Sequence, residues 1–356
     1  MAVELPPNPY DHSLHPEIYA AYNHCLELEC RDLWAVYEEE ADDFLIQPLT
    51  ELSPKVVARC LGQTLLNAPS DKARNFFAND INSCDSLGKL ASLAHLVLEG
   101  MICLFYKPKG LVPAEPQQCL YRRSFTAQAI AQANNEPLVE RNANILVRVR
   151  DNHRCIISNH VDTCAALDGI TSWAVNEHTS DTEVAHILSP SLIKNIIKNI
   201  GDPEEGVIED RAKIKRREWA SAIVTIIEHY ADISIAQELS GAQVHRAENS
   251  FTLSVALHGL FNSFYVALSP VPDPDSPTSI VHGSNSIVLT DHTDGRVPMP
   301  NPRYFELHNI CAKVMHLSGA AEVVGKLLWD LKEIDVLAED GSNAAQLSSA
   351  LPMAIG

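Results

Sequence analysis

A change of hydrophobic pattern near residue 144 constrains most strongly what this chain can fold into. Residues 15–105 carry apolar side chains at helical spacing with acidic residues on the outer face, as in "PEIYAAYNHCLELECRDLWAVYEEE". Ser53 is the predicted N-cap of one of these helices, with Pro54 at its first position. Beyond residue 144 the runs are shorter and β-branched, as in "NILVRVRDNHRCIISNH", "TEVAHIL", the start of "SFTLSVALHGLFNSFYVAL" and "NSIVLT", which predicts strands. The pattern therefore predicts an α+β protein with a mostly helical N-terminal region.

The length of 356 residues exceeds what one compact core usually holds, so we expect more than one domain. The Pro-rich stretch "YKPKGLVPAEPQQCLYRRS" breaks the helical pattern and indicates a connection. The predicted organisation is a helical domain over 1–124, a linker over 125–143, a mixed domain over 144–340 and a flexible tail over 341–356. Within the mixed domain, residues 203–230 are predicted to form a helical insertion, and "PRYFELHNICAKVMHLSGAAEVV" begins the closing helices.

Composition limits the cellular context. No run of 18 apolar residues is present, so no membrane span is expected, and the first residues lack a signal-peptide pattern. Nine dispersed cysteines without a CxxC pair indicate reduced thiols, and we expect an intracellular protein, cytoplasmic or nuclear. The formal charge of −19 repels polyanions, so nucleic-acid binding would require a local basic patch.

Three sequence pieces contain candidate functional residues. His186 lies in "EVAHILSP", Asn249 in "AENSFTLSV", and His258 and Asn262 in "LHGLFNSF". Residues four apart share one face of a helix, so His258 and Asn262 have a spacing that suits two ligands of one divalent ion. Taken singly, each piece is more simply explained by a packed core histidine or a surface pair.

The order of these pieces resembles the HNH endonuclease superfamily, specifically the HNH domains common in fungal proteins. The resemblance covers roughly residues 145–340 and rests on "RCIISN", "VAHILSP", "ENSFTLSVALHGLFNSFYVAL" and the helical "LHNICAKVMHLSGAAEVV". It implies a ββα-metal core with a helical insertion and a helical C-terminal extension. "RCIISN" would be a strand of that core.

The resemblance also implies a mechanism, metal-dependent hydrolysis of phosphodiester bonds in DNA. His186 would be the general base, and Asn249 would brace the loop and orient the His186 ring. His258 and Asn262 would hold a single divalent cation, magnesium, manganese or zinc.

Two partner surfaces are predicted. The basic run Lys213, Lys215, Arg216 and Arg217 is a candidate phosphate-contacting patch, although the simpler interpretation is the solvated face of a helix. The N-terminal helices are a candidate surface for a protein partner or a second copy of the chain.

Two positions depart from the family pattern and keep a second interpretation open. Asn262 stands where the family usually has Asp, and Ala185 stands where many members place a metal ligand. Glu183 or Asp181 could supply a carboxylate, but strand alternation puts Glu183 on the opposite face from His186. The alternative is a catalytically degenerate HNH fold that is kept as a binding or interaction module.

A third interpretation is a hydrolase with a serine or cysteine nucleophile. The sequence has no nucleophile motif to support it, and Cys155, which lies in an apolar run, is expected to be inert.

Overall fold

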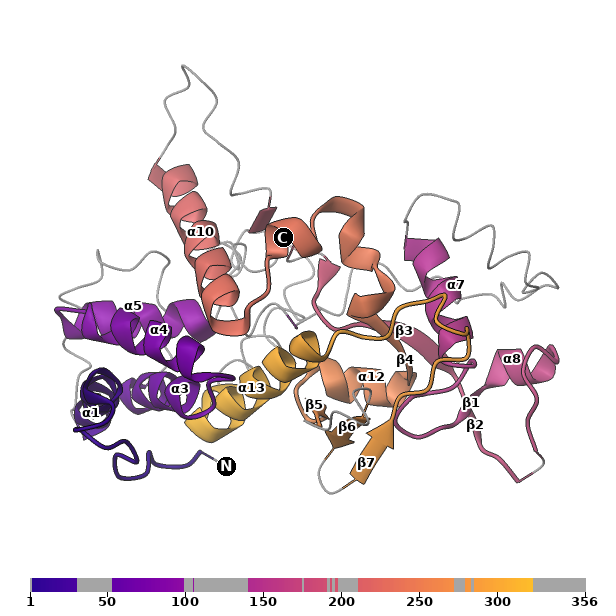
Figure 1. Ribbon diagram of the computed structural model, residues 1–356, viewed down its shortest axis with the longest axis horizontal. Helices are drawn as coiled ribbons and strands as arrows, with labels where there is room; N and C mark the ends of the chain where they lie inside the picture. The colour runs from indigo at the N-terminus through magenta and orange to yellow at the C-terminus, as the bar shows by residue number, and fades with distance from the viewer. Residues whose placement is uncertain are drawn as a thin grey trace, which may run out of the picture. The chain divides into compact units, whose positions relative to one another are not determined.

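The structure is a computed structural model, and its elements form two compact units (Figure 1). It describes residues 2–30, 53–98, 105, 140–174, 176–190, 193, 196–197, 211–271, 279–282 and 285–322. The helical unit comprises residues 1–104, 191–235 and 310–356, and the mixed unit comprises residues 105–190 and 236–309. This division is discontinuous, whereas the sequence pattern predicted contiguous domains. The predicted tail at 341–356 and most of the predicted linker, 125–139, lie outside the described residues.

The helical unit contains the helices predicted from the N-terminal pattern. They are α1 (Pro16–Cys30), α3 (Pro54–Leu66), α4 (Asp71–Asn82) and α5 (Leu87–Leu96). Serine caps begin three of them. The predicted cap Ser53 accepts a hydrogen bond from the Val56 amide, with Pro54 at the start of α3. Ser70 and Ser86 cap α4 and α5 in the same way.

Helix α10 (Arg211–Ala231) belongs to this helical unit and packs against α4 and α5. The Tyr230 hydroxyl donates to the Thr64 carbonyl at 2.7 Å, and the His229 ring stacks on Phe76. The helix predicted over 203–230 is thus present from Arg211, and residues 203–210 lie outside the described part. Its described residues group with the N-terminal helices rather than with the mixed unit.

The mixed unit contains short strands and helices. In chain order these are α7 (Glu140–Arg150), β1 (Val161–Asp162), α8 (Thr163–Leu167), β2 (Thr179–Ser180), β3 (Thr182–His186), α11 (Ile235–Glu238), η4 (Gly241–His245), η5 (Ala247–Asn249), β4 (Ser250–Ser254), α12 (Val255–Asn262), β5 (Ser269–Pro270), β6 (Ser279–His282), β7 (Asn285–Val288) and α13 (Pro302–Ser318). Strands β1 and β2 are parallel, β3 and β4 are antiparallel, and β5, β6 and β7 form an antiparallel sheet. The α+β class is confirmed. Helix α11 begins and α13 ends with residues assigned to the helical unit.

Strands β3 and β4 lie between α7 and α12 (Figure 1). The register places Ala185 opposite Phe251 and His186 opposite Ser250. The antiparallel pair of β3 and β4, which residues 187–249 connect, is called the hairpin below. Phe251 packs edge-on against Phe261 of α12, so the Ala185 side of the hairpin faces α12. The opposite side faces α7, where Val184 joins a buried cluster with Leu146, Val147, Ala247 and Val297.

The strand predicted at the start of the mixed domain is wrong, because Glu140–Arg150 forms helix α7. Its buried side chains include Ala143, Leu146, Val147 and Arg150, which follow the spacing of one helical face. The alternation of valine and arginine predicted a strand with one polar, exposed face. Arg148 and Arg150 are instead buried residues of the helix. The helix also includes residues 140–143 of the predicted linker.

"RCIISN" does not form the strand that the resemblance implied. Asn152, His153 and Asn159 adopt the left-handed conformation, so the chain turns repeatedly after α7. Within 154–159 the chain makes one isolated bridge, Arg154 to Val161, and the Ile156 amide donates to the Thr252 carbonyl of β4. This segment therefore touches the hairpin without becoming a strand of it.

No helix in the described ranges is long and apolar enough to cross a membrane. The cysteines in those ranges are free thiols at positions 25, 30, 60, 84, 155, 164 and 311.

Candidate functional site

The four predicted catalytic or metal-binding residues lie in or directly beside β3, β4 and α12. His186 is the last residue of β3, Asn249 immediately precedes β4, and His258 lies in α12. The strand passes directly into the helix because Ser254 ends β4 and caps α12, accepting from the Leu257 amide. The sequence thus holds a histidine at a strand end and another on the following helix.

Asn249 fixes the chain that follows His186. Its side-chain oxygen accepts from the Leu188 amide at 2.8 Å, and its amide nitrogen donates to the Leu188 carbonyl at 3.0 Å. Its backbone carbonyl accepts from the Ile187 amide at 2.8 Å. Asn249 is fully buried, where such hydrogen bonds cannot be exchanged for water. It therefore determines the backbone position immediately after His186, without a direct hydrogen bond to the ring.

The His186 ring is buried and meets another histidine. Its Nε2 lies 3.2 Å from Nδ1 of His245, with the two rings inclined at 74°. His245 ends η4 and is half-buried. His245 was not among the residues predicted from the sequence, because 59 residues separate it from His186 and it lies in no motif.

His258 meets a carboxylate from the strand beside it. Its Nδ1 lies 2.5 Å from the Glu183 carboxylate of β3. Its other nitrogen, Nε2, is buried without a hydrogen-bond partner in the described part of the chain. A carboxylate that accepts from Nδ1 leaves the lone pair on Nε2, which is how histidine ligands of metals are commonly oriented.

Asn262 lies four residues beyond His258 at the end of α12 and is half-buried. Ala185 is fully buried on the strand face toward α12. Glu183 shares that face, as strand alternation requires, and His186 lies on the other face. Both pairs therefore involve β3: the His186–His245 contact is at the end of the strand, and the His258–Glu183 contact is on its α12 face.

Buried charges anchor the hairpin to α7. The Arg150 side chain is 0% exposed and pairs with Asp151 at 2.8 Å, and it also donates to the Ala247, Pro298 and Ser250 carbonyls. Asp151 accepts from the Thr252 amide of β4 at 2.8 Å.

A second buried arginine holds the start of β3. Arg148 donates to the Thr182 hydroxyl at 3.0 Å and to its carbonyl at 2.9 Å. Asp162 accepts from the Thr182 hydroxyl at 2.6 Å and from the Ala165 amide at the start of α8. Buried hydrogen bonds thus hold the backbone at both ends of the hairpin, and this fixes the positions of the strands that carry or adjoin the histidines.

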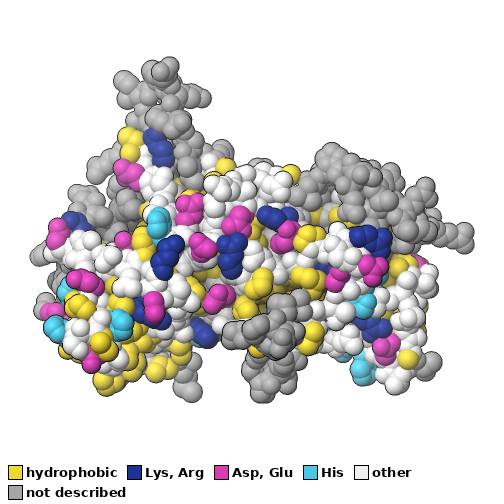
Figure 2. Space-filling model, in the orientation of Figure 1, with side chains coloured by type: hydrophobic (Ala, Val, Ile, Leu, Met, Phe, Trp, Pro, Cys, Tyr) yellow, Lys and Arg dark blue, Asp and Glu magenta, His cyan; other side chains and the backbone are white. Residues whose placement is uncertain are grey.

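The predicted basic run lies on a different unit from the histidines. Lys213, Lys215, Arg216 and Arg217 are in the first turns of α10, in the helical unit. Arg217 is half-buried, and the side chains of the other three lie outside the described part. On the face drawn in Figure 2, described acidic and basic side chains are interspersed and do not gather into one basic surface.

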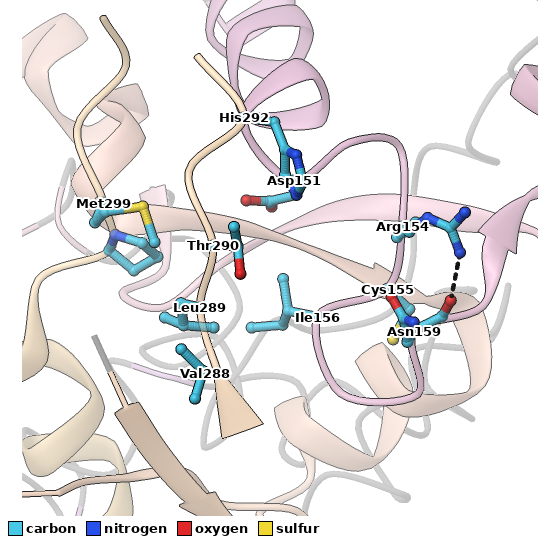
Figure 3. Close-up of a pocket in the computed structure, with 11 residues that line it drawn as sticks. Asp151, Arg154, Cys155, Ile156, Asn159, Val288, Leu289, Thr290, His292 and Met299 are labelled. Atoms are coloured by element: carbon cyan, nitrogen blue, oxygen red, sulfur yellow. Dashed lines mark hydrogen bonds between the residues drawn. The ribbon is translucent and has the colours of Figure 1, made fainter. Parts of the chain in front are cut away.

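A separate pocket lies beside the turn that follows α7 (Figure 3). Its lining comprises Asp151, Arg154, Cys155, Ile156, Asn159, Val288, Leu289, Thr290, His292, Met299 and Pro300. Arg154 donates to the Glu177 carboxylate at 3.0 Å, which compensates its charge. Cys155 is fully buried. None of the predicted catalytic or metal-binding residues lines this pocket.

Comparison with family models, with curated proteins and with solved structures finds no match to this chain. The functional interpretation therefore depends on the residues themselves.

The divalent cation implied by the HNH resemblance has one well-prepared ligand here. The buried Nε2 of His258, with Nδ1 held by Glu183, has the form of an imidazole ligand, and Asn262 shares its helix. Among the residues described, no three His, Cys, Asp or Glu side chains gather where they would hold one ion. His258 is the residue that would hold such a cation, through its Nε2 atom.

Proposed function

We propose that this protein is a metal-dependent phosphodiester hydrolase of the HNH type, acting on DNA. The observation that carries the proposal is the β3–β4–α12 arrangement, in which His186 ends β3, Asn249 immediately precedes β4 and His258 lies in α12. A strand, a second strand and a helix that carry or adjoin these three residues in this order are what the resemblance to the HNH superfamily implied.

In this proposal His186 is the general base. It accepts a proton from the water that attacks phosphorus, a task that suits a side chain with an ordinary pKa near neutrality. Asn249 is a positioning residue, because its side chain makes two hydrogen bonds to the Leu188 backbone, which follows β3, and one to the Val244 carbonyl, which precedes β4. His258 and Asn262 would hold the cation, and Glu183 would orient His258. When bound, the cation supplies charge neutralisation at the phosphate and the leaving oxygen.

Further parts of the proposal concern partners. The overall charge of −19 works against polyanion binding, so contact with DNA requires local cationic groups, and the start of α10 is the proposed source. The N-terminal helices are the proposed surface for a protein partner or for a second copy.

The test is cleavage of supercoiled plasmid by the full chain in the presence of magnesium or manganese. We expect nicking that His186→Ala reduces at least about a hundredfold, the scale of a general-base contribution. His178→Ala is the matched control, because His178 is an exposed histidine of the same unit and should leave the rate unchanged. Circular dichroism and urea unfolding establish that each variant is folded. Full activity of folded His186→Ala would exclude the assigned base.

A second candidate function is a binding module that has lost its catalytic metal. Asn262 and Ala185 favour it, since neither supplies a charged ligand beside His258. Calorimetry of manganese binding to Asn262→Asp separates the two candidates. A gain in both affinity and cleavage indicates a weakened metal site, whereas no change in either indicates a module that is not organised around a cation.

A further inference from the structure

The contact between His186 and His245 connects two elements that are far apart in sequence. His186 ends β3, and His245 ends the short helix η4 that precedes η5 and β4. The Nε2 and Nδ1 atoms are 3.2 Å apart, which is hydrogen-bond distance between two ring nitrogens. His186 is 4% exposed, whereas His245 is half-buried, so the pair extends from the interior toward the surface.

A single buried amide positions both histidines. The Asn249 side chain bonds the Leu188 amide and carbonyl, two residues after His186. The same side-chain nitrogen donates to the Val244 carbonyl at 2.9 Å, one residue before His245. One side chain therefore fixes the two backbone segments that bring the rings together. A chance contact between surface histidines would have no such support.

Two imidazole nitrogens at this distance hold one hydrogen between them. One ring donates and the other accepts, because two lone pairs or two N–H groups facing each other would repel. Adding one proton makes the bond charge-assisted and stronger. Adding a second proton places two like charges in contact, which is unfavourable. The two rings are thus expected to take up protons as one coupled unit.

The charged groups on the neighbouring elements are themselves paired. From α7, Arg150 pairs with Asp151, and Arg148 lies near Asp162 at 3.5 Å. Beside His245, Arg246 pairs with Glu248. Each of these three arginine–carboxylate pairs places a cation beside an anion. On the other face of the hairpin, the Glu183 carboxylate lies within hydrogen-bond distance of His258 Nδ1.

We propose that His186 and His245 form a proton-sharing pair in which His245 is the positioning residue for His186. The inference deepens the proposed hydrolase function and rests on it for its catalytic part. In the reaction the O–H bond of water breaks and the oxygen forms its bond to phosphorus. The P–O bond to the leaving oxygen breaks with its electron pair, and solvent protonates that oxygen. The proton from water enters the histidine pair, where it is shared between two rings.

The experiment is an NMR titration of ¹⁵N-histidine-labelled full-length protein, joined to the pH–rate profile of plasmid nicking. Three variants are compared with the unsubstituted chain. His245→Asn keeps a polar atom near the position of Nδ1, His245→Phe keeps a ring without nitrogen, and His178→Asn is the control. His178 contacts His160 with ring centroids 5.4 Å apart, so it is a histidine that touches another histidine ring in the same unit.

In the unsubstituted chain and in His178→Asn, we expect the pair to titrate in two steps separated by at least about one pH unit. In both His245 variants His186 should titrate in a single step. The acid limb of their pH–rate profiles should be displaced, relative to the unsubstituted chain, by about as many pH units as separate the two titration steps there. Independent one-step titration of His186 and His245 in the unsubstituted chain overturns the inference, whatever the nuclease activity. A pH–rate profile that His245→Asn leaves unchanged overturns the positioning role. Two-step titration without any cleavage supports the pair and overturns the proposed hydrolase.

Discussion

The Glu183 carboxylate of β3 lies 2.5 Å from Nδ1 of His258 on α12. This contact joins a strand to the helix that packs on it. In the neutral tautomer that donates from Nδ1, the lone pair of His258 lies on the buried Nε2. If His258 is a metal ligand, Glu183 is the group that orients it, and such partners typically contribute 10- to 100-fold to metal affinity.

Replacing Glu183 should therefore weaken cation binding in a graded way. Glu183→Gln keeps an oxygen acceptor and should reduce manganese affinity by roughly tenfold, whereas Glu183→Ala should approach a hundredfold. Isothermal calorimetry measures both changes. Asp294→Asn is the control, because Asp294 is a surface carboxylate with a 97% exposed side chain. Equal affinities for all the variants would contradict the assignment of His258.

Asn249 predicts a stability effect that is independent of any activity. Asn249→Asp keeps the acceptor for the Leu188 amide but loses both donated bonds, and it directs a carboxylate toward the Leu188 and Val244 carbonyls. Burying this unsatisfied charge should lower the free energy of unfolding by about 3 kcal/mol or more. Urea unfolding measures the loss. The same change at exposed Asn75 of α4 should cost little, and equal losses at the two sites would mean that the Asn249 bonds do not matter.

The N-terminal helices and the β3–β4–α12 order could be predicted from the sequence because both depend on local signals. Helical spacing with Ser53 as a cap predicted α3, and the "TEVAHIL" and "SFTLS" runs predicted β3 and β4. These signals lie within single elements and need no knowledge of tertiary contacts.

The rest could not be predicted because it depends on contacts between distant residues. Arg148 and Arg150 are buried in α7 only because Asp162, Asp151 and several carbonyls meet them. Their alternation with valine therefore resembled a strand. The same limit applies to the candidate site, where alternation placed Glu183 away from His186 but could not show that it meets His258. His245 has no local signal at all, since the loop geometry alone brings it to His186.

The buried pair Arg150–Asp151 predicts a large effect from a single neutral substitution. Asp151→Asn removes the hydrogen-bonded counter-charge of the Arg150 guanidinium, whose side chain is 0% exposed, and weakens the acceptor for the Thr252 amide. Breaking a buried ion pair in this way typically costs 3–5 kcal/mol. The loss should appear as a lower urea midpoint with an unchanged slope. A cost under about 1 kcal/mol for Asp151→Asn would contradict the anchoring role of this pair.

His308 predicts how stability depends on pH. The ring is fully buried, stacks on Phe261 with centroids 3.8 Å apart, and contacts Phe105 and Phe264. Burial lowers the pKa of His308 to about 3, against an ordinary value of 6.5, and the hydrogen bond to the Phe261 carbonyl only partly opposes this.

The folded state therefore keeps His308 neutral, while the unfolded state takes up a proton below pH 6.5. The stabilising contribution is fully present above that pH and is lost as the pH falls from about 6.5 toward 3. Between pH 7.5 and pH 5, the loss attributable to His308 should be about 2 kcal/mol, since each pH unit below 6.5 contributes about 1.4 kcal/mol.

Urea unfolding at pH 7.5 and pH 5 tests this prediction with His308→Phe, which keeps a stacked ring that cannot be protonated. The difference in unfolding free energy between the two pH values should be smaller in this variant by about 2 kcal/mol. Part of the dependence should remain, because burial also lowers the pKa of His153 and of His95 to about 4. His178→Gln, at an exposed histidine, should leave the pH dependence unchanged. An identical pH dependence in His308→Phe and the unsubstituted chain would show that His308 is accessible to protons in the folded state.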